Sequence, residues 1–400
     1  MQGYERSQKE GEEEMRECYF DYAATAPVKM EVIKYILTSY PRDFLFGNPS
    51  SNYQNGIKAR ELLEEARDLI ARSLNCKNSN ICFTSGGSES DNMALKGIML
   101  QYKPEDAELI TSQIEHPAIL NTCKELEQMG YTVHYVEPDS YGYIDPRKVE
   151  NEICTKTKLI SIMSVNNEIG TIEPINDIAD IAHKHNILFH SDMVQGIGLR
   201  YMNLTNIDLA SFSGHKFGAI KGIGFLYKKD DVQLHPLING GGQENGLRAG
   251  TENVFGALDV ALSLQNTIAE WEIINTGKMQ EHLTEFSDNL YETFGDNVIR
   301  ISLDGNNCVA NCLSLAFRNI DSRTLQLLLA QEGFYISVGS ACSSHNPEEV
   351  SHVITAIKVP KDYEKGTIRI TVPPKLYLSN LVAFLKVLKE KVKYLYESEV

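Results

Sequence analysis

The sequence has no long apolar run and no excess of basic residues, and each absence excludes a class of partner. No apolar run approaches the roughly 18 residues that a membrane-spanning helix needs, so we expect no membrane association. The 38 lysines and arginines are outnumbered by 54 aspartates and glutamates, giving a net charge of −16. Such a surface repels the phosphates of a nucleic acid, so no direct nucleic-acid partner is expected either.

The chain also lacks the cysteine patterns of a disulfide-stabilised or zinc-binding protein. Its eight cysteines form no CxxC pair. Cys308 and Cys312 are four residues apart, but no second pair or nearby histidine completes a zinc set, so we expect no metal. Eight cysteines in 400 residues are too few for a disulfide framework. Because structural disulfides are rare in a reducing compartment, their expected absence favours a cytoplasmic location.

The chain instead carries the pattern of an α/β protein. Four hundred residues are long for one compact core, so we expect two lobes behind a charged N-terminal tail. From residue 80 onward, short apolar strands alternate with amphipathic helices of about 10–15 residues, which is typical of a mostly parallel central sheet flanked by helices. The later strands and helices predict a smaller α+β lobe. We expect a tail over 1–17, a large domain over 27–265, and a small domain over 18–26 and 266–400.

The most informative stretch is residues 209–227, "LASFSGHKFGAIKGIGFLY". Lys216 lies in a loop of small residues between two apolar runs, where desolvation opposes its charge. A Schiff base with an aldehyde would remove most of that charge, and Ser213 and His215 beside it can donate hydrogen bonds to a phosphate. The combination indicates pyridoxal 5'-phosphate (PLP). The alternative at this point is a surface lysine in a glycine-rich hairpin.

Polar groups follow several of the other predicted strands, where ligands of α/β proteins bind. Gly87 and Ser88 open a helix after the strand at 80–85, so they either present N–H groups to an anion or simply cap the helix. Asp192 closes the strand "ILFHSD" and is either a cap or the partner of a pyridinium nitrogen.

Three further residues are candidates for contacts with a coenzyme or substrate. Gln195, three residues after that strand, can hydrogen-bond the oxygen of a coenzyme ring. His116 either caps the helix that begins at residue 117 or stacks on a flat ring. Asn166 is either an ordinary turn residue or an amide donor to a cofactor or substrate.

Taken together, these motifs resemble those of the PLP-dependent cysteine desulfurases, in the class V aminotransferase group of fold-type I enzymes. The resemblance runs over about residues 19–372. It includes "YFDYAATAP", "FGNPSS", "FTSGGSESDN", "IEHPAIL", "VNNEIGTI", "SFSGHK", "GGGQENGLRAGTEN" and "GSACSS". The loop after Cys342 is similar to that of the longer-loop subgroup, in which the cysteine swings between cofactor and partner. The family's fold is a large domain with a mostly parallel sheet plus a smaller α+β domain.

The resemblance assigns roles around the coenzyme. Lys216 would form the Schiff base and move the Cα proton, with His116 stacked on the ring as a further catalytic residue. Asp192 would pair with the ring nitrogen and Gln195 with the ring oxygen. The phosphate would be held by Gly87, Ser88, Ser213 and His215.

The resemblance also assigns the substrate side and an assembly. Thr251 would reach the phosphate of the neighbouring subunit, which implies a homodimer. Arg369 would bind the carboxylate of L-cysteine together with Asn166, because a guanidinium fork fits a carboxylate. Cys342 would be the nucleophile, since a thiolate is suited to attack on sulfur and its small neighbours leave it accessible.

The implied activity is removal of sulfur from L-cysteine, giving L-alanine and a persulfide on Cys342 that passes to sulfur-acceptor proteins. Iron–sulfur cluster assembly and tRNA or other thiolation are possible destinations. One alternative is a sister PLP enzyme, such as a selenocysteine lyase or a cysteine C–S lyase. Another is a non-catalytic scaffold that docks sulfur-acceptor proteins. The chain departs from the family pattern at 217–220 and 371–374.

Overall fold

The computed structural model describes residues 18–197, 204–274, 276–303, 305–338 and 350–398. Cys342, the predicted nucleophile, lies outside these residues. Within the described part of the chain, no helix is long and apolar enough to cross a membrane.

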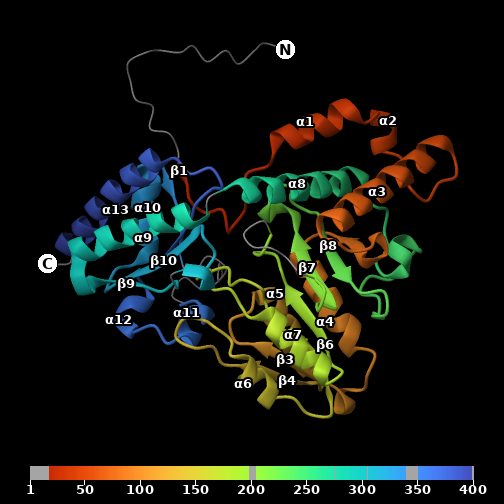
Figure 1. The fold of residues 1–400 in the computed structure, drawn as a ribbon, viewed down its shortest axis with the longest axis horizontal. Coiled ribbons are helices and arrows are strands. Elements are labelled where there is room, and N and C mark those ends of the chain that lie inside the picture. The colour runs from red at the N-terminus through yellow and green to blue at the C-terminus, as the bar shows by residue number, and fades with distance from the viewer. Residues whose placement is uncertain (1–17, 198–203, 275, 304, 339–349, 399–400) are drawn as a thin grey trace.

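A seven-stranded sheet with the order β2-β8-β7-β6-β5-β3-β4 forms the centre of the larger part of the molecule (Figure 1). Its strands are β2 (Ile81–Thr84), β3 (Glu108–Ser112), β4 (Thr132–Val136), β5 (Thr157–Ser161), β6 (Leu188–Asp192), β7 (Leu209–Ser213) and β8 (Gly224–Lys228). The pairs from β7 to β4 are parallel, but β8 is antiparallel to both of its neighbours. The short connection between β7 and β8 explains this, since a parallel pair needs a crossover of a dozen or more residues.

Helices cover both faces of this sheet, as the alternation of strands and helices predicts. One face packs against α4 (Gly87–Met99) and α5 (Pro117–Gln128). The other face packs against α3 (Gln54–Ser73), α6 (Pro146–Asn151), α7 (Ile175–Lys184) and α8 (Val254–Ile273), with α1 (Met30–Ser39) and α2 (Arg42–Leu45) further out. Leu109 and Leu209 belong to the first core and their neighbours Ile110 and Ala210 to the second, because successive strand residues point to opposite faces.

A second, smaller sheet has its own core. Strands β9 (Val298–Arg300), β10 (Cys312–Phe317), β12 (Ser337–Val338) and β13 (Thr367–Thr371) pair antiparallel in the order β12-β13-β10-β9. Its core is covered by α9 (Thr276–Phe294), α10 (Ser322–Gln331) and α13 (Leu378–Ser398). Phe286, Phe334 and Phe384 pack together in this core. The short helices α11 (His352–Ala356) and α12 (Lys361–Glu364) instead contribute buried residues to the core of the larger part. The exact domain boundaries stay a prediction.

The N-terminal end of the described chain links the two parts. Strand β1 (Cys18–Tyr19) pairs in parallel with β11 (Phe334–Tyr335) of the smaller part. The chain then runs beside β13, where the backbone N–H of Ala23 donates to Thr371 Oγ1 at 3.0 Å. It reaches the large sheet at Ala26, whose N–H donates to the carbonyl of His215 at 2.9 Å. Residues 21–26 therefore lie over the carboxyl ends of the central strands.

Candidate functional site

A cavity of about 320 Å³ lies at the carboxyl ends of β6 and β7, beside the N-terminal end of α4. This is where ligands of open α/β sheets bind. Its lining includes most of the residues predicted from the sequence: Gly87, Ser88, His116, Asp192, Gln195, Ser213, His215, Lys216 and Arg369. A larger adjoining cavity of about 790 Å³ shares Lys216 and Gln195 with it, so Lys216 lies where the two meet.

Lys216 ends the short helix η3 (Gly214–Lys216) that follows β7. Its Nζ donates hydrogen bonds to the backbone carbonyls of Ala23 at 2.8 Å and Ala24 at 3.0 Å. The turn is tightly packed at Gly214, because a Cβ there would lie 3.0 Å from both Ala219 Cβ and the carbonyl oxygen of Ile223. The lysine is therefore held at the cavity by acceptors from a segment almost two hundred residues away.

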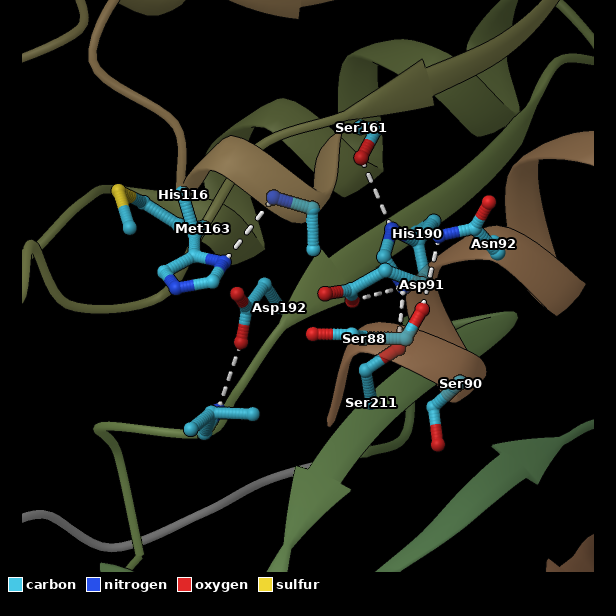
Figure 2. A network of polar contacts seen from close by, with 12 residues as sticks. Ser88, Ser90, Asp91, Asn92, His116, Ser161, Met163, His190, Asp192 and Ser211 are labelled. Atoms are coloured by element: carbon cyan, nitrogen blue, oxygen red, sulfur yellow. Dashed lines mark hydrogen bonds and ion pairs between the residues drawn. The ribbon is translucent and has the colours of Figure 1, made fainter. Parts of the chain in front are cut away.

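Asp192 and His116 also line the cavity and lie close to each other (Figure 2). Asp192 is 6 % exposed, and its Oδ1 accepts the N–H of Val194 at 2.9 Å. Burial raises the pKa of Asp192, while the nearby His116 and Lys216 oppose the rise. His116 both lines the cavity and caps α5, because its Nδ1 accepts the N–H of Ala118 at 3.1 Å. Burial lowers the pKa of His116, which favours its neutral form. Because Nδ1 accepts a hydrogen bond, the neutral ring carries its proton on Nε2.

The other end of the cavity is suited to an anion. Gly87 and Ser88 open α4, a helix of 13 residues, so unsatisfied N–H groups face the cavity there. Close packing at Gly87 excludes a side chain, since a Cβ would lie 2.8 Å from Val194 Cγ2. His215 bonds Thr25 Oγ1 through Nδ1 at 3.1 Å, and burial lowers its pKa to about 4, so it is neutral at neutral pH.

Arg369 and Gln195 take partners from the same N-terminal segment that holds the lysine. Arg369 is 7 % exposed; its Nη2 pairs with Asp21 Oδ1 at 2.6 Å and its Nη1 donates to the carbonyl of Asn167 at 2.5 Å. Its Nε has no hydrogen-bond partner among the described residues. Gln195 donates from Nε2 to the carbonyl of Ala23 at 2.9 Å. A buried guanidinium N–H without a partner is available to a carboxylate.

Asn166 lines the larger adjoining cavity but not this one, and its side-chain amide is already hydrogen-bonded, which does not match the expected donor to the cofactor or substrate. Asn166 is 1 % exposed, its Nδ2 donates to the carbonyl of Ile114 at 3.0 Å, and its Oδ1 accepts two backbone N–H groups of the following turn. The next residue, Asn167, lines the cavity instead. The residue predicted from the sequence is Asn166, the first of the two adjacent asparagines in "VNNEIGT". The hydrogen bonds of the turn, which the sequence pattern does not give, engage Asn166 and leave Asn167 at this cavity.

Two acids at the cavity were missed from the sequence. Asp91 lies on α4 four residues after Gly87, and that spacing places both residues on one helix face. Glu168 follows Asn167 in the same turn, and burial raises its pKa to about 7. The helical spacing could have revealed Asp91 as a candidate. Nothing in the sequence pattern distinguishes Glu168 from a turn residue.

The residues fit the coenzyme that the sequence predicts. A helix N-terminus with a glycine cradle can hold a phosphate, a buried carboxylate can face a ring nitrogen, and a lysine can meet an aldehyde. Thr251 is exposed and does not line the cavity of its own chain.

The chain is similar over most of its length to several known proteins. The family model described as aminotransferase class-V matches residues 18–374. A cysteine desulfurase IscS from Dictyoglomus turgidum is 41% identical over 363 residues, covering 89% of this chain and 89% of the relative. The solved structure of a NifS-like protein has a TM-score of 0.86 and 35% identity, covering 95% of this chain and all of the other. A structure of SspA in complex with cysteine has a TM-score of 0.77 and 36% identity, covering 90% of this chain and all of the other.

Proposed function

This chain belongs to the aminotransferase class-V family and is a PLP-dependent cysteine desulfurase, and on that premise we propose how its residues carry out the reaction. The bound coenzyme supplies an electron sink beside the Cα of the substrate. The single observation that carries the proposal is the cavity in which Lys216, Asp192 and the N-terminus of α4 come together.

The chain's own groups position and move protons around the coenzyme. Lys216 would take the Cα proton, and the carbonyls of Ala23 and Ala24, which accept hydrogen bonds from its Nζ, would stabilise the resulting ammonium. Asp192 would hold the ring nitrogen, and the N–H of Val194 fixes the orientation of its carboxylate. His116 would stack on the ring, and its capping bond to α5 keeps the imidazole in place.

L-cysteine binds with its carboxylate at Arg369. The ion pair with Asp21 balances the charge of that guanidinium, so the site offers the substrate little net positive charge. The Nε of Arg369, which has no hydrogen-bond partner among the described residues, and the side chain of Asn167 would instead orient the carboxylate through hydrogen bonds. Asn167 takes the place that the sequence assigned to Asn166.

Cys342 is the nucleophile of the proposed reaction. Its thiolate attacks the substrate sulfur; an S–S bond forms, the Cβ–S bond breaks, and the electron pair of that bond remains with the carbon fragment that leaves as L-alanine. The described residues on both sides of the segment that contains Cys342 support this assignment. Val338 lines the cavity, and His352 Nε2 bonds the carbonyl of Glu115 at 2.9 Å, next to His116.

A homodimer completes the site in this proposal. Exposed large apolar side chains gather on α1 and the residues around it, which is typical of a surface covered by a partner. They are Val28, Met30, Tyr35, Leu37, Phe46 and Tyr53. Thr251 is exposed away from its own cavity, consistent with a contact to the phosphate of a second copy. The persulfide then passes in the cytoplasm to acceptor proteins of iron–sulfur cluster assembly or thiolation.

The test is the substitution Cys342→Ser, with Cys154→Ser as the matched control because Cys154 is an exposed cysteine away from the cavity. We expect the Cys342→Ser variant to keep the visible absorption band of bound coenzyme, and to lose alanine formation and protein-bound label from sulfur-labelled cysteine. The control should retain all three. Undiminished alanine formation after the substitution of Cys342 would instead support the sister lyase.

A further inference from the structure

Asp91 is a buried carboxylic acid beneath the predicted coenzyme site, and the proposed reaction leaves it without a role. It is 1 % exposed and lines the cavity of Asp192 and Lys216. Its carboxylate, that of Asp192 and a ring nitrogen of His116 have donor atoms that all lie within 4.8 Å of one another. Its Oδ1 has no hydrogen-bond partner among the described residues. Figure 2 shows Asp91 between Asp192 and His190.

A chain of hydrogen bonds approaches Asp91 from the side away from the cavity. His190 is fully buried, and burial lowers its pKa to about 3, so it is neutral. Its Nδ1 bonds Ser161 Oγ at 2.8 Å and its Nε2 bonds Ser211 Oγ at 2.9 Å (Figure 2). Ser211 in turn hydrogen-bonds the carboxyl of Asp91. None of these partners carries a charge that could balance a carboxylate at residue 91.

The charged and titratable groups around Asp91 favour its neutral form. Strand β6 contributes Asp192 and the neutral His190, and the residues before α5 contribute Glu115 and His116. Strands β5 and β7 contribute the hydroxyls of Ser161 and Ser211, and Lys216 faces the cavity from further away. Burial and repulsion from Asp192 raise the pKa of Asp91 well above its usual value.

Asp192 is the better site for a single negative charge. It accepts the N–H of Val194, and both His116 and Lys216 favour its ionised form. Two carboxylates this close in a buried site do not both ionise near neutral pH. The proton of the pair therefore belongs to Asp91.

We propose that Asp91 is a positioning residue that works as a neutral acid: by holding a proton beneath the cavity, it leaves the negative charge of the pair to Asp192. The proposal rests on the proposed contact between Asp192 and the ring nitrogen. A protonated Asp91 still accepts the hydrogen bond from Ser211 and packs under Asp192, so it fixes the shape of the site without adding a second charge to it.

The experiment compares Asp91→Asn, a neutral isostere, with Asp91→Ala and Asp192→Asn in the coenzyme-loaded protein. The readouts are the dissociation constant of PLP and the pH midpoint of the visible absorption band, which responds to charge near the coenzyme. Asp91→Asn should leave the PLP dissociation constant within about twofold and the midpoint within a few tenths of a pH unit, since it removes no charge. Asp91→Ala should weaken PLP binding by about tenfold, because it leaves Ser211 without its acceptor and a cavity under Asp192.

Three results would contradict the proposal or the premise on which it rests. A shift of the midpoint by about one pH unit or more in Asp91→Asn would show that residue 91 carries a charge, and would overturn the proposal. Equal PLP affinity in Asp91→Ala and the wild type would overturn the positioning role. Asp192→Asn separates these results from a failure of the premise: if its midpoint and affinity do not change, the proposed role of Asp192 is wrong.

The stability of the coenzyme-free protein gives a second readout that involves no catalysis. Because the pKa of Asp91 is raised in the folded state, the unfolded chain loses this proton at lower pH than the folded one, and folding becomes less favourable as pH rises between the two values. Asp91→Asn should therefore have a higher melting temperature than the wild type at pH 7 and none of that advantage at pH 4. An advantage that does not depend on pH would contradict a proton held by Asp91.

Discussion

The floor and the rim of the cavity are built in different ways. The floor comprises Asp91, His116, His190 and Asp192, whose partners lie on adjacent strands or within the same turn. The rim comprises residues 21–26 and the side chains they bind, and its contacts join residues far apart in the chain. Arg369 and Asp21 are separated by 348 residues, and Lys216 and Ala23 by 193. The floor is a local product of the sheet, whereas the rim exists only when both ends of the chain are in place.

The two regions also handle charge differently. Burial lowers the pKa values of His116 and His190 and raises that of Asp91, so the floor limits its charge to one carboxylate. The rim instead contains an ion pair between Asp21 and Arg369. In the proposed site, a coenzyme ring would meet a floor of little charge, and a substrate carboxylate would meet a guanidinium that is already paired. The predictions below test this contrast.

The largest effect should come from Lys216, where floor and rim meet. Lys216→Ala removes both the amine and its hydrogen bonds to Ala23 and Ala24, so alanine formation should fall on the order of 10³-fold. Lys216→Arg is the matched control, because it keeps a cation for the two carbonyls but cannot form an imine. It should be as inactive as Lys216→Ala yet more stable to urea; activity in either variant would refute the assignment.

The next effect concerns the rim. The side chains of Asp21 and Arg369 are 18% and 9% exposed, so Asp21→Ala leaves a largely buried guanidinium without its counter-charge. We expect the free energy of unfolding to fall by about 3 kcal/mol, measured by urea denaturation. Combining Asp21→Ala with Arg369→Met should recover part of the loss, since the unpaired charge is gone. Equal losses in the single and double variants would mean that the ion pair is not the cause.

A smaller effect should follow from adding a side chain at Gly87, which lies beside the floor of the cavity. The Cβ of Gly87→Ala would lie 2.8 Å from Val194 Cγ2, and Val194 is the residue whose N–H holds Asp192. The displacement should weaken PLP binding by about tenfold, measured by titration of the coenzyme-free protein. Gly242→Ala is the control, because no heavy atom lies within 4 Å of its Cβ and its φ of −83° suits alanine. Similar losses in both variants would contradict the packing explanation.

The smallest effect is a pH dependence at Glu168. Burial raises its pKa to about 7, while its hydrogen bond from Ser351 and the charge of Arg369 oppose the rise. Between about pH 4.5 and 7 the unfolded chain has released a proton that the folded chain keeps, so stability falls as pH rises through this window. Glu168→Gln should remove that slope and gain about 1 kcal/mol above pH 7, measured by urea denaturation at several pH values. If the free energy of unfolding of Glu168→Gln still fell with pH as steeply as that of the wild type, another group would be responsible for the pH dependence.

The same contrast explains what the sequence could predict. Four of the predicted site residues either end or follow an apolar strand or open a helix: Asp192, His116, Ser88 and Lys216. Because parallel strands end at the same edge of a sheet, these positions alone predict that the four residues lie near one another. The orientation of β8 was not predicted, because a strand pattern does not carry its direction. The alternation of strands and helices also does not reveal that the backbone carbonyl of Ala23 accepts hydrogen bonds from both Lys216 and Gln195.

Contacts within the folded chain also decide which of two similar residues lines the cavity, and the sequence pattern does not show these contacts. The turn after β5 consumes the amide of Asn166 and leaves Asn167 at the cavity, although the two residues are identical in type. The pairing of Asp21 with Arg369 joins the start of the described chain to its last strand, and no local pattern links them. The roles of Cys342 and Thr251 in the reaction stay predictions.

The path of residues 21–26 has a consequence for how the protein is made. Asp21 and Arg369 are 348 residues apart in the chain, so a ribosome must add all the residues between them before their ion pair can form. A nascent chain that lacks β13 therefore leaves Asp21 without this partner. If Arg369 binds the substrate carboxylate as proposed, a chain cut short before β13 should release no sulfur from cysteine.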